Sequence, residues 1–468
     1  MILTLIFGFL SFDTLLNIPE LQNAHYGLCF YDLTADSMIY EYNGARVFVP
    51  ASNMKLITTA AALYFLGDDF RYKTFLYLRG RINEKRLYGD IVLQGGGDPN
   101  FSIENMEKFV RKIQELGINE ITGAILVIDD YFTNERLPIG WAWHYLDAKY
   151  APEISALSFN KNVVSVRIRP QSIGETALVY IHPPTKYVKL INNIVSTANS
   201  ENLIIYRKPE ENLIVVEGMI KNARDIDVAV KDPALFAGEY LKERLSAQGV
   251  KINKPVARIR SYEIFIGKES PILADSILSS PLIEIIKETN TESENLYAEI
   301  LLKTLGAQLY KEGSFNAGLT VVKNFLTKCG VDTGWVSIWD GSGLSKHNLL
   351  SPRALIAVLK FMYQSNLFYD FYNSLPDPGK GTLKARFNGF SDTLKAKTGA
   401  IQAASCLSGY LKVNGTDYAF SLLFNNFTCP TKKITQIQEK IIRTFAEAQR
   451  KKNLENIRTV NPAEVIQQ

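Results

Sequence analysis

Cysteine and histidine are scarce in this chain of 468 residues, which has four of each. The cysteines are Cys29, Cys329, Cys406 and Cys429, and the histidines are His25, His144, His182 and His347. Neither set has the short spacing of metal ligands or of a redox pair, so we expect no metal and no cofactor. Because Cys29 and Cys406 lie in apolar, strand-like runs, we expect buried free thiols there, and a disulfide stays open as the alternative.

An excess of charge of one sign is also missing. The chain has 52 Lys and Arg against 48 Asp and Glu, a formal net charge of +4. A net charge this small gives no reason to expect a nucleic-acid partner. The hydrophobic content of 46% and charged content of 21% are ordinary for a globular protein. The length predicts two or three domains.

No apolar run is long enough to span a bilayer, so no transmembrane segment is predicted. Residues 1–12 are uncharged and apolar, but they are too few to cross a membrane. They resemble the apolar core of a signal peptide that lacks a basic start and an obvious cleavage site. We favour an atypical or truncated export signal, and a first buried helix is the alternative.

The most informative stretch is residues 50–55, Pro-Ala-Ser-Asn-Met-Lys, which precede a helix-forming run closed by Gly67. Ser52 and Lys55 stand three residues apart, so the hydroxyl and the amine share one face of the helix start. Ser52 can instead be a simple helix cap, but a capping box would place Glu or Gln where Lys55 stands. A cation there opposes the positive end of the helix dipole, and such a broken local rule indicates function.

Two further motifs follow in the chain. Ser293-X-Asn295 precedes a predicted helix over 296–310, and Lys397-Thr398-Gly399 ends a predicted strand that starts at residue 393. Alone, the first motif can be a helix cap and the second a turn after a strand. Together with Ser-X-X-Lys, in this order, they match the motif trio Ser-X-X-Lys, Ser-Asp-Asn and Lys-Thr-Gly of β-lactamases and penicillin-binding proteins, except that Glu294 stands at the middle of the second motif.

The chemistry explains these residue types. A serine hydroxyl is a good nucleophile only when a neighbouring base takes its proton. Lys55 can be that base only when neutral, and the ordinary lysine pKa is about 10.4. Burial and a second cation both lower a lysine pKa, and we expect Lys397 to be that cation. The backbone N–H of Ser52 is a natural donor to an oxyanion.

The other motif residues fit the same reaction. Lys397 and Thr398 are expected to bind the terminal carboxylate of a substrate. Gly399 has no side chain, so an extended peptide can lie along the strand edge. Ser293 is expected to relay a proton to the leaving amine, and Asn295 to hold the amide of the acyl side.

With these motifs in hand, residues 27–448 resemble the class C low-molecular-mass penicillin-binding proteins, the D-alanyl-D-alanine carboxypeptidase/endopeptidase family of the penicillin-binding protein 4 type. Ser52 and Ser293 are 293 − 52 = 241 residues apart, a gap much longer than in β-lactamases. Further stretches that look like family signatures are residues 96–99, 155–160, 295–299, 340–345 and 381–383. The resemblance implies that the N–H of Ala400 is a second oxyanion donor.

The resemblance also implies the fold, a mixed α/β (α+β) architecture in three parts. A β-lactamase/transpeptidase-like domain would take residues 1–70 and 271–468. An inserted α/β domain would take 71–160 and 221–270, and a nested β-rich subdomain would take 161–220. The tryptophan loop departs from the family pattern, because His144 and Tyr145 stand where acidic residues are expected, with Asp147 slightly beyond. This departure leaves the preference for the substrate side chain open.

The function implied is that of an exported D,D-peptidase of the periplasm or cell envelope. It would act on peptidoglycan stem peptides through an acyl-enzyme at Ser52, with β-lactams as covalent inhibitors. A β-lactamase or serine esterase on the same scaffold is one alternative, and a catalytically weak peptidoglycan-binding protein is another. Carboxypeptidase and endopeptidase action, and the oligomeric state, both stay open.

Overall fold

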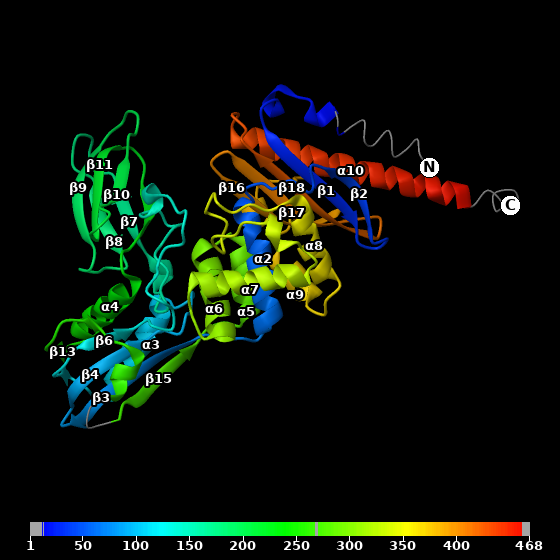
Figure 1. Ribbon diagram of the computed structural model, residues 1–468. Coiled ribbons are helices and arrows are strands. Elements are labelled where there is room, and N and C mark those ends of the chain that lie inside the picture. The colour runs from blue at the N-terminus through cyan, green and yellow to red at the C-terminus, as the bar shows by residue number, and fades with distance from the viewer. Residues whose placement is uncertain (1–11, 13, 267–269, 461–468) are drawn as a thin grey trace, which may run out of the picture. The chain divides into compact units, whose positions relative to one another are not determined.

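The computed structural model describes residues 12, 14–266 and 270–460 and separates into two compact units (Figure 1). The first unit takes Met1–Asp68, Ile286–Glu294 and Leu319–Gln468, and the second takes Asp69–Ile285 and Asn295–Gly318. Apart from Phe12, the proposed export signal lies outside the described residues. Among the described helices, none combines the length and the apolar character needed to cross a bilayer.

The first unit is built on a five-stranded antiparallel sheet with the strand order β16-β17-β18-β1-β2. The strands are β1 (His25–Asp32), β2 (Ser37–Tyr42), β16 (Thr393–Ile401), β17 (Ala404–Val413) and β18 (Thr416–Asn425). The predicted strands over 27–33, 38–42, 404–413 and 417–424 are thus confirmed. The first strand lies beside the last, with His25 paired to Asn425, so the two ends of the chain close one sheet.

Helices cover both faces of this sheet (Figure 1). They are α2 (Met54–Leu66), α8 (Pro352–Tyr363), α9 (Phe368–Ser374) and α10 (Thr431–Val460); α5 (Leu282–Thr291) and α7 (Phe315–Lys328) contribute residues to both units. On the α10 face, Phe445 stacks on Phe30 of β1 with ring centroids 4.1 Å apart. On the α8 face, the Tyr410 hydroxyl donates to the carbonyl of Leu359 at 2.8 Å.

The last helix is longer than the sequence indicated. We expected residues 434–449, but α10 continues to Val460. The added residues are mostly straight-chain polar residues that favour a helix, and the next proline is Pro462. Polarity alone is therefore no sign that a helix has ended.

The cysteine prediction is confirmed for the described chain, in which all four cysteines are free and Cys29 and Cys406 are buried. Burial raises the pKa of both of these thiols to about 12. They are therefore inert apolar side chains of the sheet core rather than reactive groups.

The second unit has a seven-stranded mixed sheet in which β3 and β4 form the long central hairpin. Its strands are β3 (Lys73–Asn83), β4 (Arg86–Gln94), β5 (Glu120–Ile121), β6 (Ile125–Ile128), β13 (Lys251–Ile252), β14 (Ala257–Arg258) and β15 (Ile272–Leu278), and its helices are α3 (Ile103–Glu115), α4 (Pro233–Ala247) and α6 (Asn295–Tyr310). Phe101, Phe109, Phe159 and Phe236 are fully buried in the core of this unit.

Two three-stranded sheets complete the second unit, with the orders β10-β11-β9 and β12-β7-β8. The strands are β7 (Val163–Arg169), β8 (Leu178–His182), β9 (Lys189–Ser196), β10 (Ile204–Arg207), β11 (Leu213–Ile220) and β12 (Arg224–Ala229). The first five agree with the predicted strand-rich block. The sixth, β12, was not predicted, and it pairs antiparallel with β7.

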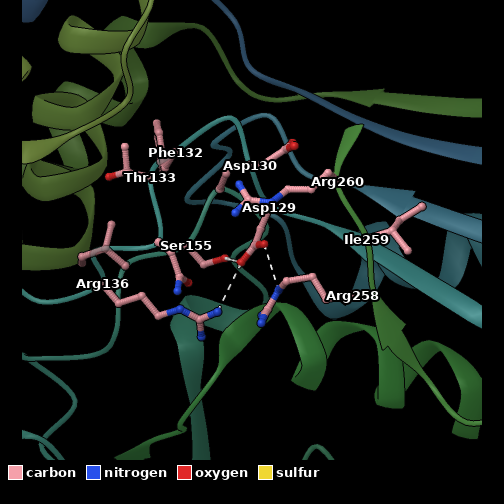
Figure 2. Close-up of a pocket in the computed structure, with 12 residues that line it drawn as sticks. Asp129, Asp130, Phe132, Thr133, Arg136, Ser155, Arg258, Ile259 and Arg260 are labelled. Atoms are coloured by element: carbon pink, nitrogen blue, oxygen red, sulfur yellow. Dashed lines mark hydrogen bonds and ion pairs between the residues drawn. The ribbon is translucent and has the colours of Figure 1, made fainter. Parts of the chain in front are cut away.

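An ion-pair network in the second unit surrounds a polar pocket of about 110 Å³ (Figure 2). Asp129, at the end of β6, accepts from Arg258 at 3.0 Å and from Ser155 at 3.2 Å, and Arg136 lies 3.5 Å away. Asp232 caps α4 and pairs with both Arg136 and Arg258. The charges of the acids and arginines at its centre neutralise one another. We therefore interpret the ion pairs around the pocket as structural contacts that hold β6, β14 and α4 together.

Candidate active site

Ser52 lies in a short 3-10 turn, Ala51–Asn53, that leads directly into α2. The Nζ of Lys55, one turn on, donates to the Oγ of Ser52 at 2.9 Å. Lys55 is fully buried, whereas Ser52 is partly exposed. The N-cap of α2 is Asn53, and no side-chain hydrogen bond caps the helix. The hydroxyl of Ser52 is therefore engaged with an amine and not with the helix end.

A polar loop over residues 340–345 fixes the other side of the Lys55 amine. Lys55 Nζ donates to the backbone carbonyl of Ser342 at 2.8 Å. The loop is held by Asp340, whose fully buried carboxylate accepts from the N–H of Gly343 at 2.8 Å and of Ser345 at 2.6 Å. Asp340 thus determines where the carbonyl that meets Lys55 stands. In the sequence this loop is recognisable only as a family signature, and nothing there indicates its contact with Lys55.

The backbone is strained at Ala51, beside Ser52, and at Ser293. Ala51 has a φ of 45° and Ser293 has a φ of 64°, in the left-handed region that residues other than glycine rarely adopt. Gly343 packs against the Ala51 turn so closely that an added Cβ would lie 1.8 Å from the Ala51 carbonyl oxygen. Strain of this kind persists only where surrounding contacts enforce it, and it clusters at functional sites.

Lys397 forms the second serine–lysine pair of the first unit. Its Nζ donates to the Oγ of Ser293 at 2.9 Å and to the carbonyl of Thr398 at 3.1 Å. Burial, and next the charge of Lys55, lower the pKa of Lys397 well below its ordinary value, although Glu292 opposes the shift. We expected Lys397 to lower the pKa of Lys55, and that stays a prediction; the effect seen here is the reciprocal one, of Lys55 on Lys397.

The Lys-Thr-Gly motif does not end its strand, and that prediction is wrong. β16 continues through Gly399 to Ile401, with Gly399 opposite Cys406 of β17. The glycine is needed for a close approach rather than for a turn. An added Cβ would lie 2.8 Å from the carbonyl oxygen of Pro50 and 3.0 Å from the backbone nitrogen of Ser52. β16 therefore runs directly against the turn that carries the hydroxyl.

Asn295 belongs to the second unit, where it begins α6. It is buried, and its Nδ2 donates to the carbonyl of Tyr150 at 2.7 Å. Tyr150 ends the aromatic loop that contains His144 and Tyr145. The carboxylate of Asp147 in that loop accepts from the backbone N–H of Arg207 at 3.2 Å, so it is engaged by the protein itself.

Asn53 is a second residue that sequence analysis missed. Asn53 is fully buried, and its Nδ2 donates to the Oγ of Ser408 at 2.6 Å. The Ser408 hydroxyl in turn donates to the Oγ of Ser421 at 2.9 Å. This chain of contacts ties the Ser52 turn to β17 and β18. The only signal in the sequence is that Asn53 is a polar residue next to Ser52.

The first unit thus brings together two serine–lysine pairs, in which a hydroxyl contacts a buried amine. That arrangement suits acyl transfer, because the amine can take the proton of the attacking hydroxyl. In the described part of the chain, no group of three or more His, Cys, Asp or Glu side chains is placed to hold a metal ion.

Comparisons with known proteins agree with this chemistry. The family model described as D-Ala-D-Ala carboxypeptidase 3 (S13) matches residues 11–448. The D-alanyl-D-alanine carboxypeptidase of Actinomadura sp. (strain R39) is 30% identical over 454 residues, which are 93% of this chain and 84% of that protein. The penicillin-sensitive carboxypeptidase A of Dictyostelium discoideum is 25% identical over 445 residues, 86% of this chain and 83% of that protein.

The fold is shared with a solved penicillin-binding protein. The crystal structure of penicillin-binding protein 4 (dacB) from Haemophilus influenzae superposes with a TM-score of 0.80 at 22% identity, covering 93% of this chain and 99% of that one. The expected mixed α/β architecture is confirmed by this likeness. The chain belongs to the D-Ala-D-Ala carboxypeptidase 3 (S13) family, and it is a serine-type D-Ala-D-Ala carboxypeptidase.

Proposed function

We propose that Ser52 is the nucleophile of this peptidase and that Lys55 is its general base. The observation that carries the proposal is the 2.9 Å contact between Lys55 Nζ and Ser52 Oγ. Lys55 takes the hydroxyl proton as Oγ attacks the carbonyl carbon of the penultimate D-Ala. The C–N bond breaks, D-Ala leaves, and an ester at Ser52 remains until water hydrolyses it.

Ser293 and Lys397 serve the leaving group and the substrate carboxylate. Ser293 relays the proton to the departing amine, which is supported by its contact with Lys397 at 2.9 Å. Lys397 and Thr398 bind the terminal carboxylate, and that anion favours the charged form of Lys397. Asn295 holds the amide of the acyl side.

The backbone N–H groups of Ser52 and Ala400 are the proposed oxyanion donors. The tight packing of Gly399 against the Ser52 turn supports this role, because it leaves no room for a side chain between strand and turn. A substrate peptide then extends along the free edge of β16.

The substrates proposed are peptidoglycan stem peptides, with cleavage at D-Ala-D-Ala termini or at D-Ala-containing cross-links. The penicillin-sensitive relative supports acylation of Ser52 by β-lactams. A protein with this substrate works in the periplasm or cell envelope. Within this assignment, we propose the three-part organisation with residues 161–220 as the nested subdomain.

The substrate side chain meets an aromatic loop in this proposal. Asp147 is engaged by Arg207, whereas Trp143 is 78% exposed and stands beside His144 with ring centroids 5.7 Å apart. A free amino group on the stem therefore finds aromatic side chains at positions 143–145, where the family pattern has acids after the tryptophan, and we expect a weaker preference for that amino group.

Product analysis by mass spectrometry tests the function. The protein is incubated with a free pentapeptide stem and with a cross-linked muropeptide dimer, with and without penicillin. Loss of one D-Ala marks carboxypeptidase action, and penicillin-blocked conversion of dimer to monomers marks endopeptidase action. Rapid turnover of penicillin itself favours the β-lactamase alternative.

Covalent labelling by a fluorescent penicillin tests the nucleophile. We expect Ser52→Ala to abolish labelling and Ser37→Ala, an exposed serine at the start of β2, to retain it. Labelling that survives in Ser52→Ala contradicts the assignment. Absence of turnover with intact labelling of the native protein favours a peptidoglycan-binding protein.

A further inference from the structure

An open groove lies on the first unit at the sheet edge opposite the active-site strand. β16 forms one edge of the five-stranded sheet, and β2 forms the other. Four strand spacings of about 4.8 Å separate the two edges, or about 19 Å. Two hollows, of about 750 and 500 Å³, meet at the β2 edge and share Trp335 and Ala45 as lining residues. Their sizes lie within the range of ligand sites.

Aromatic rings form the platform of this groove. Trp335 is 77% exposed, and Tyr42, at the end of β2, is 42% exposed. Tyr42 is held in place by stacking on Tyr26, with ring centroids 5.2 Å apart. Trp335 and Tyr42 both line the larger hollow, so two aromatic faces are presented to one space, where a flat ligand can pack on them.

Polar groups surround the rings. Gln22, Asn43 and Arg46 line the larger hollow, and Asp332 and Arg353 line the smaller one. Arg353 pairs with Glu41 at 2.8 Å. By contrast, Arg46 is exposed, and no residue in the described chain pairs with its guanidinium. The groove therefore offers flat aromatic faces, amide donors and acceptors, and one available cation.

We infer that this groove binds the glycan strand of peptidoglycan, an inference that rests on the proposed substrate. The C–H faces of sugar rings pack on aromatic rings, and their hydroxyl and acetamido groups bond to amides. Muramyl residues without a stem peptide carry a lactyl carboxylate, which suits Arg46. Because the groove lies at the β2 edge and not at β16, the bound sugar does not occupy the strand edge proposed for the stem. The groove anchors the enzyme on its polymer.

Calorimetric titration with two soluble glycans tests the inference. One is a glycan strand freed of stem peptides by an amidase, and the other is chitohexaose, which lacks lactyl carboxylates. We expect Trp335→Ala to bind both about five- to tenfold more weakly, the loss expected for an aromatic contact. Arg46→Gln is expected to weaken only the carboxylate-bearing strand. Tyr369→Ala, an equally exposed aromatic on α9 of the same unit, serves as the matched control.

Hydrolysis of a soluble pentapeptide separates this inference from the proposed function. We expect Trp335→Ala to keep native rates on the pentapeptide and to lose activity on intact sacculi. Normal pentapeptide hydrolysis with no glycan binding, or with equal binding by Trp335→Ala, overturns the inference and leaves the function standing. A dimer in light scattering that Trp335→Ala dissociates also overturns it, because a second copy then covers the groove.

Discussion

At the scale of single residues, we expect Asp340 to position the Lys55 amine, because it holds the loop whose Ser342 carbonyl accepts from Lys55. Its buried carboxylate accepts two backbone N–H groups and the Nδ2 of Asn348 at 2.7 Å. Asp340→Asn keeps the shape but turns one acceptor into a donor that faces the N–H of Ser345. Bonds to charged acceptors contribute about 1.5–3 kcal/mol, so we expect penicillin acylation to slow about 10- to 100-fold.

The readout must separate positioning from stability. Stopped-flow acylation across pH reports on the base, and thermal unfolding reports on the fold. Asp32→Asn is the control, because Asp32 also accepts two turn N–H groups, of Thr34 and Ala35, in the same unit but away from Lys55. If the acylation rates of both variants fall only in proportion to the fall in their thermal stability, Asp340 has no positioning role.

The lowered pKa of Lys397 leads us to expect that binding of the substrate carboxylate depends on pH. Burial and Lys55 lower its pKa, so the free enzyme loses this proton at a lower pH than an ordinary lysine. As pH rises through that point, Lys397 becomes neutral and binds a carboxylate less well. We therefore expect kcat/KM for a D-Ala-D-Ala substrate to fall at high pH, and the fall to be smaller when the terminal carboxylate is amidated. Identical falling limbs for the two substrates contradict a carboxylate role.

At the scale of elements, the contact between β16 and the Ser52 turn requires Gly399. A methyl group there would press on the Pro50 carbonyl at 2.8 Å, and overpacking of this kind costs about 1–3 kcal/mol. Because the displaced atoms belong to the nucleophile turn, we expect Gly399→Ala to reduce penicillin acylation about tenfold or more. Thr393→Ala, at the exposed start of the same strand, should acylate at the native rate. A native acylation rate in Gly399→Ala would show that the Ser52 turn can shift to accommodate the methyl group without loss of reactivity.

The elements themselves were largely predictable. Helix starts with a clear signal were found, as at Pro352 after Ser351, and so were strands with alternating burial such as β7. The continuation of β16 past Gly399 was not predicted, because a glycine in the sequence indicates a turn as readily as a close approach of another backbone segment. The extra length of α10 was missed because a polar helix and a polar tail have similar compositions.

At the scale of the whole molecule, pattern alone could not bring the motifs together. Ser52, Ser293 and Lys397 meet in the first unit because the chain leaves this unit twice and returns. Long-range pairing of this kind has no local signal, so the prediction came from the order of the three motifs and from family resemblance. The loop over residues 340–345 shows what sequence patterns cannot predict. The Ser342 carbonyl in this loop accepts from Lys55, and that contact depends on the position of the backbone rather than on residue type.

The pairing of β1 with β18 has a consequence for folding kinetics. The paired residues lie between 418 − 32 = 386 and 425 − 25 = 400 positions apart, so the two strands meet only when nearly the entire chain is available. Contacts this distant in sequence form late and slowly. During synthesis, α2 and the Ser52 turn are made long before β16, β17 or β18. Peptidase activity should thus arise as one late event, and a truncated translation product that stops before residue 393 carries Ser52 without the strand that packs against its turn.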